Sequence, residues 1–207
     1  MGRPGLAIIA VFCLAVVACP RPAPPLPPAP EPTPAPAEVI TPPSADEQEV
    51  MAALAMEGAQ ALGGLSAQSD VHHGATWFEG NVPTGRSTAY LLLGKLGEGG
   101  ASTLRFVVRY EGNQPANLGN CTVVVDGADI ASFSPAPNRV DQPPGGSVHQ
   151  LADIHFDDVR PAVLAMINGQ SAVIRTAGGK EIRLGRAELD EMRRVLSAYL
   201  HLQVGAP

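Results

Sequence analysis

The sequence predicts an α+β fold, with an antiparallel sheet of about six or seven short strands covered on one face. Three observations predict it. Several short segments alternate between apolar and polar residues, helical spacing appears at both ends of residues 44–207, and two turn sequences each separate segments able to pair as hairpins. With 207 residues in total, we expect a single globular domain over residues 44–207, preceded by appendages.

An N-terminal helix is expected to begin after Ser44. Ser44-Ala-Asp-Glu47 matches a capping box, in which the Ser hydroxyl faces the first helical amides and Glu47 reaches back. Apolar residues then recur at helical spacing until Gly63-Gly64 ends the segment. Gly58 should weaken the middle of this helix by about 1 kcal/mol relative to Ala.

The strands are expected after residue 87, because residues 65–87 show no clear period. Asp126-Gly127 and residues 177–179 are typical hairpin turns, and the proline- and glycine-rich residues 134–147 indicate a loop. The predicted strands cover residues 88–93, 104–110, 121–125, 128–133, 148–156, 172–176 and 180–184.

Two further helices complete the predicted domain. A short internal helix should be capped by Asp157 or Asp158 and end at Asn168-Gly169. Residues 188–202 have the apolar stripe of an amphipathic C-terminal helix, on which Asp190 and Arg194 form a favourable i,i+4 pair.

The N-terminus has the features of an export signal. Residues 6–17 are 12 consecutive apolar residues after Arg3, fewer than the roughly 20 that cross a bilayer. Val16-Val17-Ala18-Cys19 resembles the lipobox of bacterial lipoproteins. The resemblance implies that residues 1–18 are a signal peptide cleaved before Cys19, and that the Cys19 thiol carries a diacylglycerol. Ordinary secretion and an uncleaved anchor are the alternatives.

Residues 19–43 are expected to be a disordered tether. Residues 20–43 contain 12 prolines, a density that no helix or sheet ladder accommodates. Extended polyproline chain rises about 3.1 Å per residue, so the tether would reach roughly 70 Å. We interpret it as a spacer between lipid and domain; the alternative is a ligand for a proline-reading partner.

Sequence features also indicate a location and exclude some partners. In the lipoprotein family, Asp after the lipidated Cys commonly marks inner-membrane retention, so Pro20 implies the outer membrane, facing the periplasm. The alternatives are the outer surface of the plasma membrane and secretion.

The net charge of −6 argues against nucleic-acid binding. The glycine-rich residues 97–100 lack the Lys-Ser/Thr of a P-loop, and we expect no cofactor.

Few residues are candidates for chemistry. With Cys13 removed and Cys19 lipidated, Cys121 cannot form an intramolecular disulfide, and its apolar segment indicates a buried structural thiol.

His149, Asp153 and His155 share one face of a predicted strand, where Asp153 and His155 are about 6.6 Å apart. His72-His73 would be able to complete a metal site. However, no HExxH or paired-Cys spacing supports one, and polar residues on the solvated side of a half-buried strand are the ordinary explanation.

We therefore expect a lipid-anchored, non-enzymatic envelope protein of binding or structural type, whose monomeric domain contacts another envelope protein or a cell-wall component. The alternative is a periplasmic module that binds a ligand or a metal, or that catalyses hydrolysis, with His149, Asp153 and His155 in its site. Residues 160–207 hold 7 Lys and Arg against 4 Asp and Glu. We expect this basic segment to pair within the domain rather than with lipid or a partner.

Lipidation gives the first prediction. Mass spectrometry of the mature N-terminus should find residue 19 carrying a diacylglycerol, and Cys19→Ala should release the protein from membranes because the acyl chains are lost. An unmodified residue 19 would contradict the lipoprotein assignment.

Overall fold

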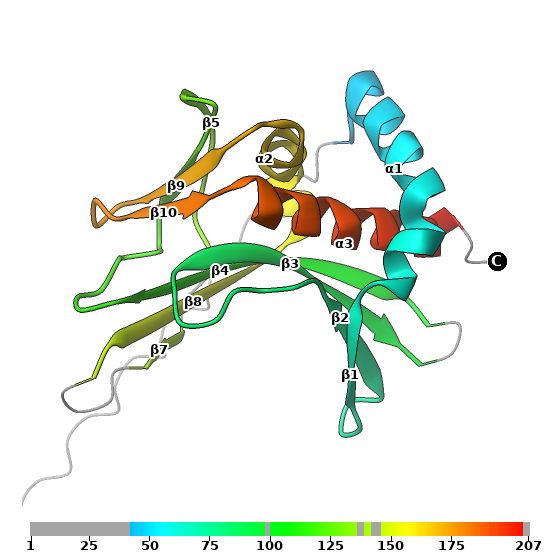
Figure 1. The fold of residues 1–207 in the computed structure, drawn as a ribbon, viewed down its shortest axis with the longest axis horizontal. Helices are drawn as coiled ribbons and strands as arrows, with labels where there is room; N and C mark the ends of the chain where they lie inside the picture. Colours follow the sequence, from blue (N-terminus) through cyan, green and yellow to red (C-terminus); the bar gives the residue numbers. More distant parts are fainter. Residues whose placement is uncertain (1–41, 98–99, 136–138, 142–145, 205–207) are drawn as a thin grey trace, which may run out of the picture. The chain divides into compact units, whose positions relative to one another are not determined.

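Three helices and a four-stranded sheet lie on one side of a six-stranded antiparallel sheet (Figure 1). This computed structural model describes residues 42–97, 100–135, 139–141 and 146–204. The predicted signal peptide, Cys19 and nearly all of the tether lie outside the described residues and stay predictions. The described residues belong to one compact unit that spans residues 39–207.

The larger sheet is antiparallel throughout, and within it β4 (Ser102–Gly112) pairs with β3 (Thr88–Leu96) on one side and with β8 (Val148–His155) on the other. Arg105 of β4 lies opposite His155 of β8, a pairing of residues 50 positions apart. In spatial order the strands are β1 (Ser66–Asp70), β2 (Ala75–Glu79), β3 (Thr88–Leu96), β4 (Ser102–Gly112), β8 (Val148–His155) and β7 (Arg139–Asp141).

The smaller sheet contains both predicted hairpins, which are confirmed. Its strands are, in spatial order, β10 (Glu181–Leu184), β9 (Ala172–Thr176), β5 (Cys121–Val125) and β6 (Ala128–Phe133).

The α+β class with an antiparallel sheet is therefore confirmed, and the ten described strands form two such sheets, one of six strands and one of four. The missed strands are β1, β2 and β7. The hairpin of β1 and β2 was missed because β1 does not alternate between apolar and polar residues. Four of its five residues are exposed. Strand β7 is only three residues long and lies within the predicted 134–147 loop.

The three expected helices are α1 (Ala45–Gly63), α2 (Phe156–Asn168) and α3 (Arg186–Val204). The capping box of α1 is present: the Glu47 amide donates to Ser44 Oγ at 3.2 Å, and the Ser44 amide donates to the Glu47 carboxylate at 2.8 Å. No helix in the described residues combines the length and apolar character that spanning a bilayer requires.

The predicted cap of α2 at Asp157 or Asp158 is wrong. Strand β8 runs directly into the helix, so the N-cap position falls on His155, whose side chain makes no capping hydrogen bond. Asp157 and Asp158 lie in the first turn instead, where the positive end of the helix dipole favours carboxylates.

One hydrophobic core joins both sheets to the helices. Phe106 of β4 packs edge-on against Phe133 of β6, with ring centroids 5.9 Å apart, and thereby connects the two sheets. Phe156 of α2 makes a similar contact with Tyr199 of α3 at 6.2 Å. Because strands of both sheets contribute to this core, the two sheets form one folded unit.

Helices α1 and α3 cross in close contact at Gly58. A Cβ added there would lie 2.2 Å from His201 Cβ and 2.3 Å from the Ser197 carbonyl oxygen. At these distances the two helices would have to shift apart. Gly58 therefore lowers helix propensity but permits this close approach of the two helices.

Substitution of Gly58 separates these two effects. Helix propensity alone predicts that Gly58→Ala stabilises the protein by about 1 kcal/mol. Because the added methyl group meets the α3 backbone, we expect instead a loss of about 1–3 kcal/mol in the free energy of unfolding, measured by urea titration. Gly63→Ala in the same helix is the control, since a Cβ there meets nothing within 4 Å. Stabilisation by Gly58→Ala would contradict the close crossing.

The β5–β6 turn is attached to the segment that follows α2. Asp126 and Gly127 have φ angles of 49° and 88°, left-handed values typical of a two-residue hairpin turn. The Asp126 carboxylate accepts hydrogen bonds from the backbone amides of Gln170 at 3.1 Å and Ser171 at 2.9 Å. These hydrogen bonds lower the pKa of Asp126 below its ordinary value of 3.8.

This attachment should make stability depend on pH. Asp126→Asn keeps the turn but replaces a charged acceptor with a neutral one, so we expect a lower free energy of unfolding at pH 7. Because the folded-state pKa of Asp126 is depressed, its contribution is complete above about pH 5 and is lost as pH falls through the folded pKa. The difference between wild type and variant in urea unfolding should therefore shrink at acidic pH. A difference that is constant with pH would contradict this role.

Candidate functional site

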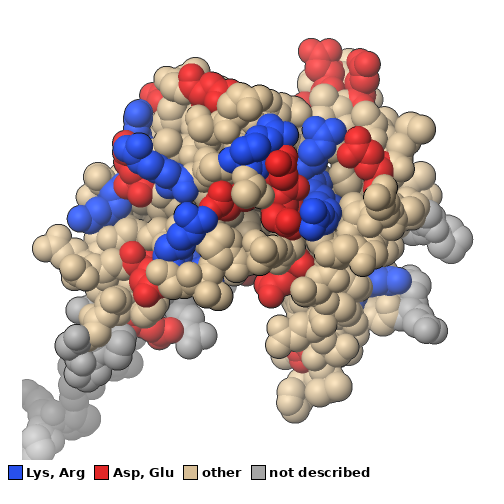
Figure 2. Space-filling model, viewed as in Figure 1, with Lys and Arg blue, Asp and Glu red and all other residues tan. Residues whose placement is uncertain are grey.

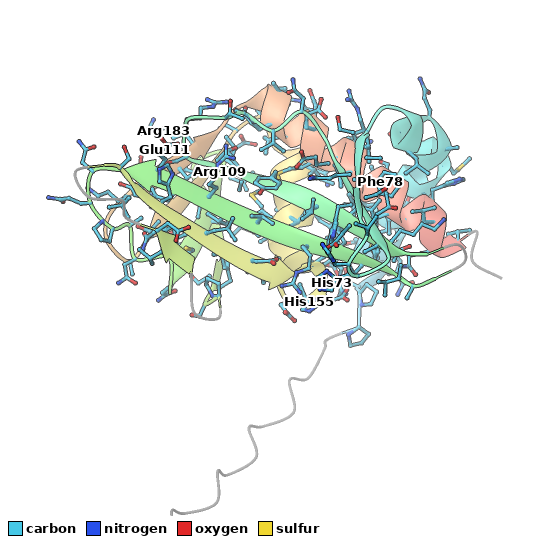
Figure 3. The ribbon with its side chains drawn as sticks, turned by 90° about the horizontal axis from the view of Figure 1, so that it is seen from below. His73, Phe78, Arg109, Glu111, His155 and Arg183 are labelled. Carbon is cyan, nitrogen blue, oxygen red and sulfur yellow. The ribbon has the colours of Figure 1, made fainter. Side chains whose placement is uncertain are left out.

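The six-stranded sheet has one face that no helix of the described residues covers (Figure 3). We call this surface the open face. Strand β4 shows how it arises, because Phe106 and Val108 point into the core while the alternate residues Arg105, Val107 and Arg109 lie on the other side. Register adds neighbours to these residues from β3 and β8, namely Tyr90, Leu92, His149, Leu151, Asp153 and His155.

Arg105 connects two of the predicted site residues. Its Nε donates a hydrogen bond to Asp153 Oδ1 at 2.7 Å, and its Nη1 lies 2.6 Å from His155 Nε2. Since a guanidinium only donates, His155 is the acceptor in this contact, through Nε2. Asp153 and His155 are thus held in fixed positions by a positive charge between them.

This arrangement does not form the metal site considered above. A guanidinium between Asp153 and His155 repels a cation and uses their ligand atoms. His149 lies six residues from His155 on the same strand, roughly 20 Å away, so the two cannot share an ion with ligand distances of about 2 Å. Within the described ranges, no group of three or more His, Cys, Asp and Glu residues is placed to hold a metal, and His72 and His73 join none.

Arg109 on the open face contacts a backbone carbonyl oxygen instead of a carboxylate. Its Nη2 donates to the Pro83 carbonyl oxygen, and its Nε is buried without a hydrogen-bond partner. No carboxylate in the described part of the chain pairs with it. Tyr90 lies nearby, and burial raises the pKa of its phenol while the charge of Arg109 acts in the opposite direction. Arg109 thus leaves a half-buried positive charge beside an aromatic ring.

The thiol of Cys121 has a structural environment. Cys121 is 1% exposed, and its Sγ donates to the Leu118 carbonyl oxygen at 3.5 Å. Burial raises its pKa to about 11, so the thiolate that a nucleophile requires is scarce at neutral pH.

Arginines of the C-terminal part of the chain pair with carboxylates of the same domain, as expected, although Arg194 pairs with Glu191 at 3.1 Å and not with Asp190 as predicted. Figure 2 shows the two signs of charge intermixed on the face it presents. Arg193 of α3 lies 3.5 Å from Glu57 of α1, and Arg186 lies 2.8 Å from Asp190. Arg175 of β9 is within 3.4 Å of two carboxylates, Glu181 on the adjacent β10 and Asp129 on β6. This internal pairing leaves little excess charge to attract lipid headgroups.

Sequence reasoning placed His149, Asp153 and His155 on a common face but missed Tyr90, Arg105 and Arg109. The alternation of residues 104–110 already put both arginines on the polar side of a strand. Their neighbours depend on the β4–β8 register, which no local pattern reveals.

Comparisons of the chain with protein-family models, curated proteins and solved structures find no match.

Proposed function

We propose that the protein is a lipid-anchored, non-enzymatic binding protein of the bacterial cell envelope, and that its domain binds an envelope component through the open face. The lipobox-like Val16-Val17-Ala18-Cys19 and the proline-rich residues 20–43 support the anchor and the spacer. A spacer of roughly 70 Å would let the domain reach material beyond the lipid surface.

The open face is the observation that carries the binding role. Apolar side chains of Tyr90, Leu92 and Leu151 remain partly exposed there, beside the incompletely paired Arg109. Partly exposed apolar groups next to fixed polar groups are typical of binding surfaces. The Arg105–Asp153–His155 contacts fix polar groups in advance, which reduces the entropy lost on binding.

A binding role also agrees with how the candidate chemical groups are used. Cys121 is a buried thiol with a raised pKa, and Asp126 accepts backbone hydrogen bonds at a turn. Asp157 and Asp158 stabilise the start of α2.

Photo-crosslinking in growing cells tests the proposal. A photoreactive phenylalanine at Leu151, within the open face, should form a discrete adduct with an envelope component on illumination. The same residue at Met56 of α1, which is 89% exposed, is the control and should form no such adduct.

Equal labelling at both positions, or a discrete adduct at Met56 alone, would contradict binding through the open face. The far-ultraviolet circular dichroism of both variants should match the wild type, because both positions are at the surface.

A further inference from the structure

The hairpin formed by β1 and β2 projects away from the body of the domain at one end of the open face (Figures 1 and 2). The hairpin carries a hollow of about 350 Å³, a volume within the range of small-molecule sites. The hollow is lined by Gln68, Ser69, Asp70, Val71, His72 and Trp77.

Trp77, the only tryptophan in the chain, is placed by strand geometry. It lies directly opposite Gln68 on β1 and Gly94 on β3. A Cβ added at Gly94 would lie 2.7 Å from the Trp77 ring, so glycine is what allows the ring to lie against the sheet. The indole remains partly exposed and lines the hollow. Its position is therefore fixed while part of its surface is open to a ligand.

Polar groups beside this ring are available for hydrogen bonds. Within the part of the chain that the structure describes, the Gln68 amide, the His72 ring and the Trp77 indole N–H have no side-chain hydrogen-bond partner. The turn that carries His72 is held by Asp70, whose carboxylate accepts from the His72 and His73 amides and contacts His73 Nδ1 at 2.8 Å. Donors and acceptors thus stand beside an aromatic surface on an ordered turn.

The charge of the hairpin selects the class of ligand. Residues 66–79 contain no Lys or Arg, and their charged residues are Asp70 and Glu79. Phosphate-bearing ligands such as nucleic acids or lipid headgroups need clustered cations, which this hairpin lacks. A neutral pyranose ring has an apolar C–H face that stacks on an indole and hydroxyl or acetamido groups that pair with amide and imidazole side chains.

From this geometry we infer that the β1–β2 hollow binds a neutral, N-acetylated glycan, with Trp77 stacking on one sugar ring and Gln68 and His72 hydrogen-bonding its substituents. The inference rests on the proposed binding role and names the partner as the glycan strand of the cell wall.

Trp77 fluorescence gives a direct test, because no other tryptophan contributes to the emission. The full chain, in a zwitterionic detergent without a sugar headgroup, is titrated with the tetramer of N-acetylglucosamine. The inference predicts a saturable change in Trp77 emission and a matching calorimetric isotherm. Absence of a saturable change in both measurements would overturn it.

Two variants locate the site. Gln68→Ala, at an exposed strand position, should weaken binding about fivefold, the factor that corresponds to one hydrogen bond. Gln60→Ala makes the same change on an exposed face of α1 and should leave the affinity unchanged. Equal affinities for the two variants would exclude the hollow as the site. Trp77→Ala removes the aromatic face and should abolish calorimetric binding, with its fold checked by circular dichroism.

The outcomes also separate this inference from the proposed function. If the tetramer does not bind but the Leu151 adduct forms on a protein, the glycan assignment is wrong and binding through the open face stands. If the tetramer binds and Leu151 forms no adduct, the hollow is a glycan site and the binding role of the rest of the open face is wrong.

Discussion

The alternation of side chains along β4 is the constraint on which the rest of the domain depends. One set, which includes Phe106, enters the core and contacts Phe133 of the smaller sheet. The alternate set, Arg105, Val107 and Arg109, forms the centre of the open face. Since strand side chains alternate with a period of two, a shift of one residue in register would bury the arginines and expose the core. The same backbone geometry therefore determines both the stability of the fold and the chemistry of its surface.

Local patterns predicted those elements that local interactions determine. The hairpins at residues 121–133 and 172–184 were predictable because each joins two apolar segments through a typical turn. The capping box at Ser44 was predictable because its partners are three residues apart. In contrast, Ser66–Asp70 is exposed and has no apolar period, so its strand depends on pairing with β2. Arrangement of the strands into two sheets likewise depends on pairings distant in the sequence.

The candidate site was predictable only in part, for the same reason. The alternation of side chains along one strand placed His149, Asp153 and His155 on a single face. It did not show that Arg105 lies between Asp153 and His155. That contact arises from the β4–β8 register. Gly58 gives a parallel case, since its low helix propensity is visible in the sequence while the α1–α3 crossing that requires it is not. Sequence patterns identify which residues share an element, and tertiary packing decides what they touch.

Binding through the open face requires that this surface contacts an envelope component while α1 remains exposed to solvent. Hydroxyl-radical footprinting tests it most directly, because oxidation of a side chain reports its accessibility. The protein is oxidised in isolated envelopes and, separately, after purification in detergent. Trp77, Tyr90 and Leu151 should be oxidised less in envelopes, whereas Met56 of α1 should react equally in both samples. Equal oxidation of the open-face residues in both samples, or protection of Met56 instead, would contradict binding through the open face.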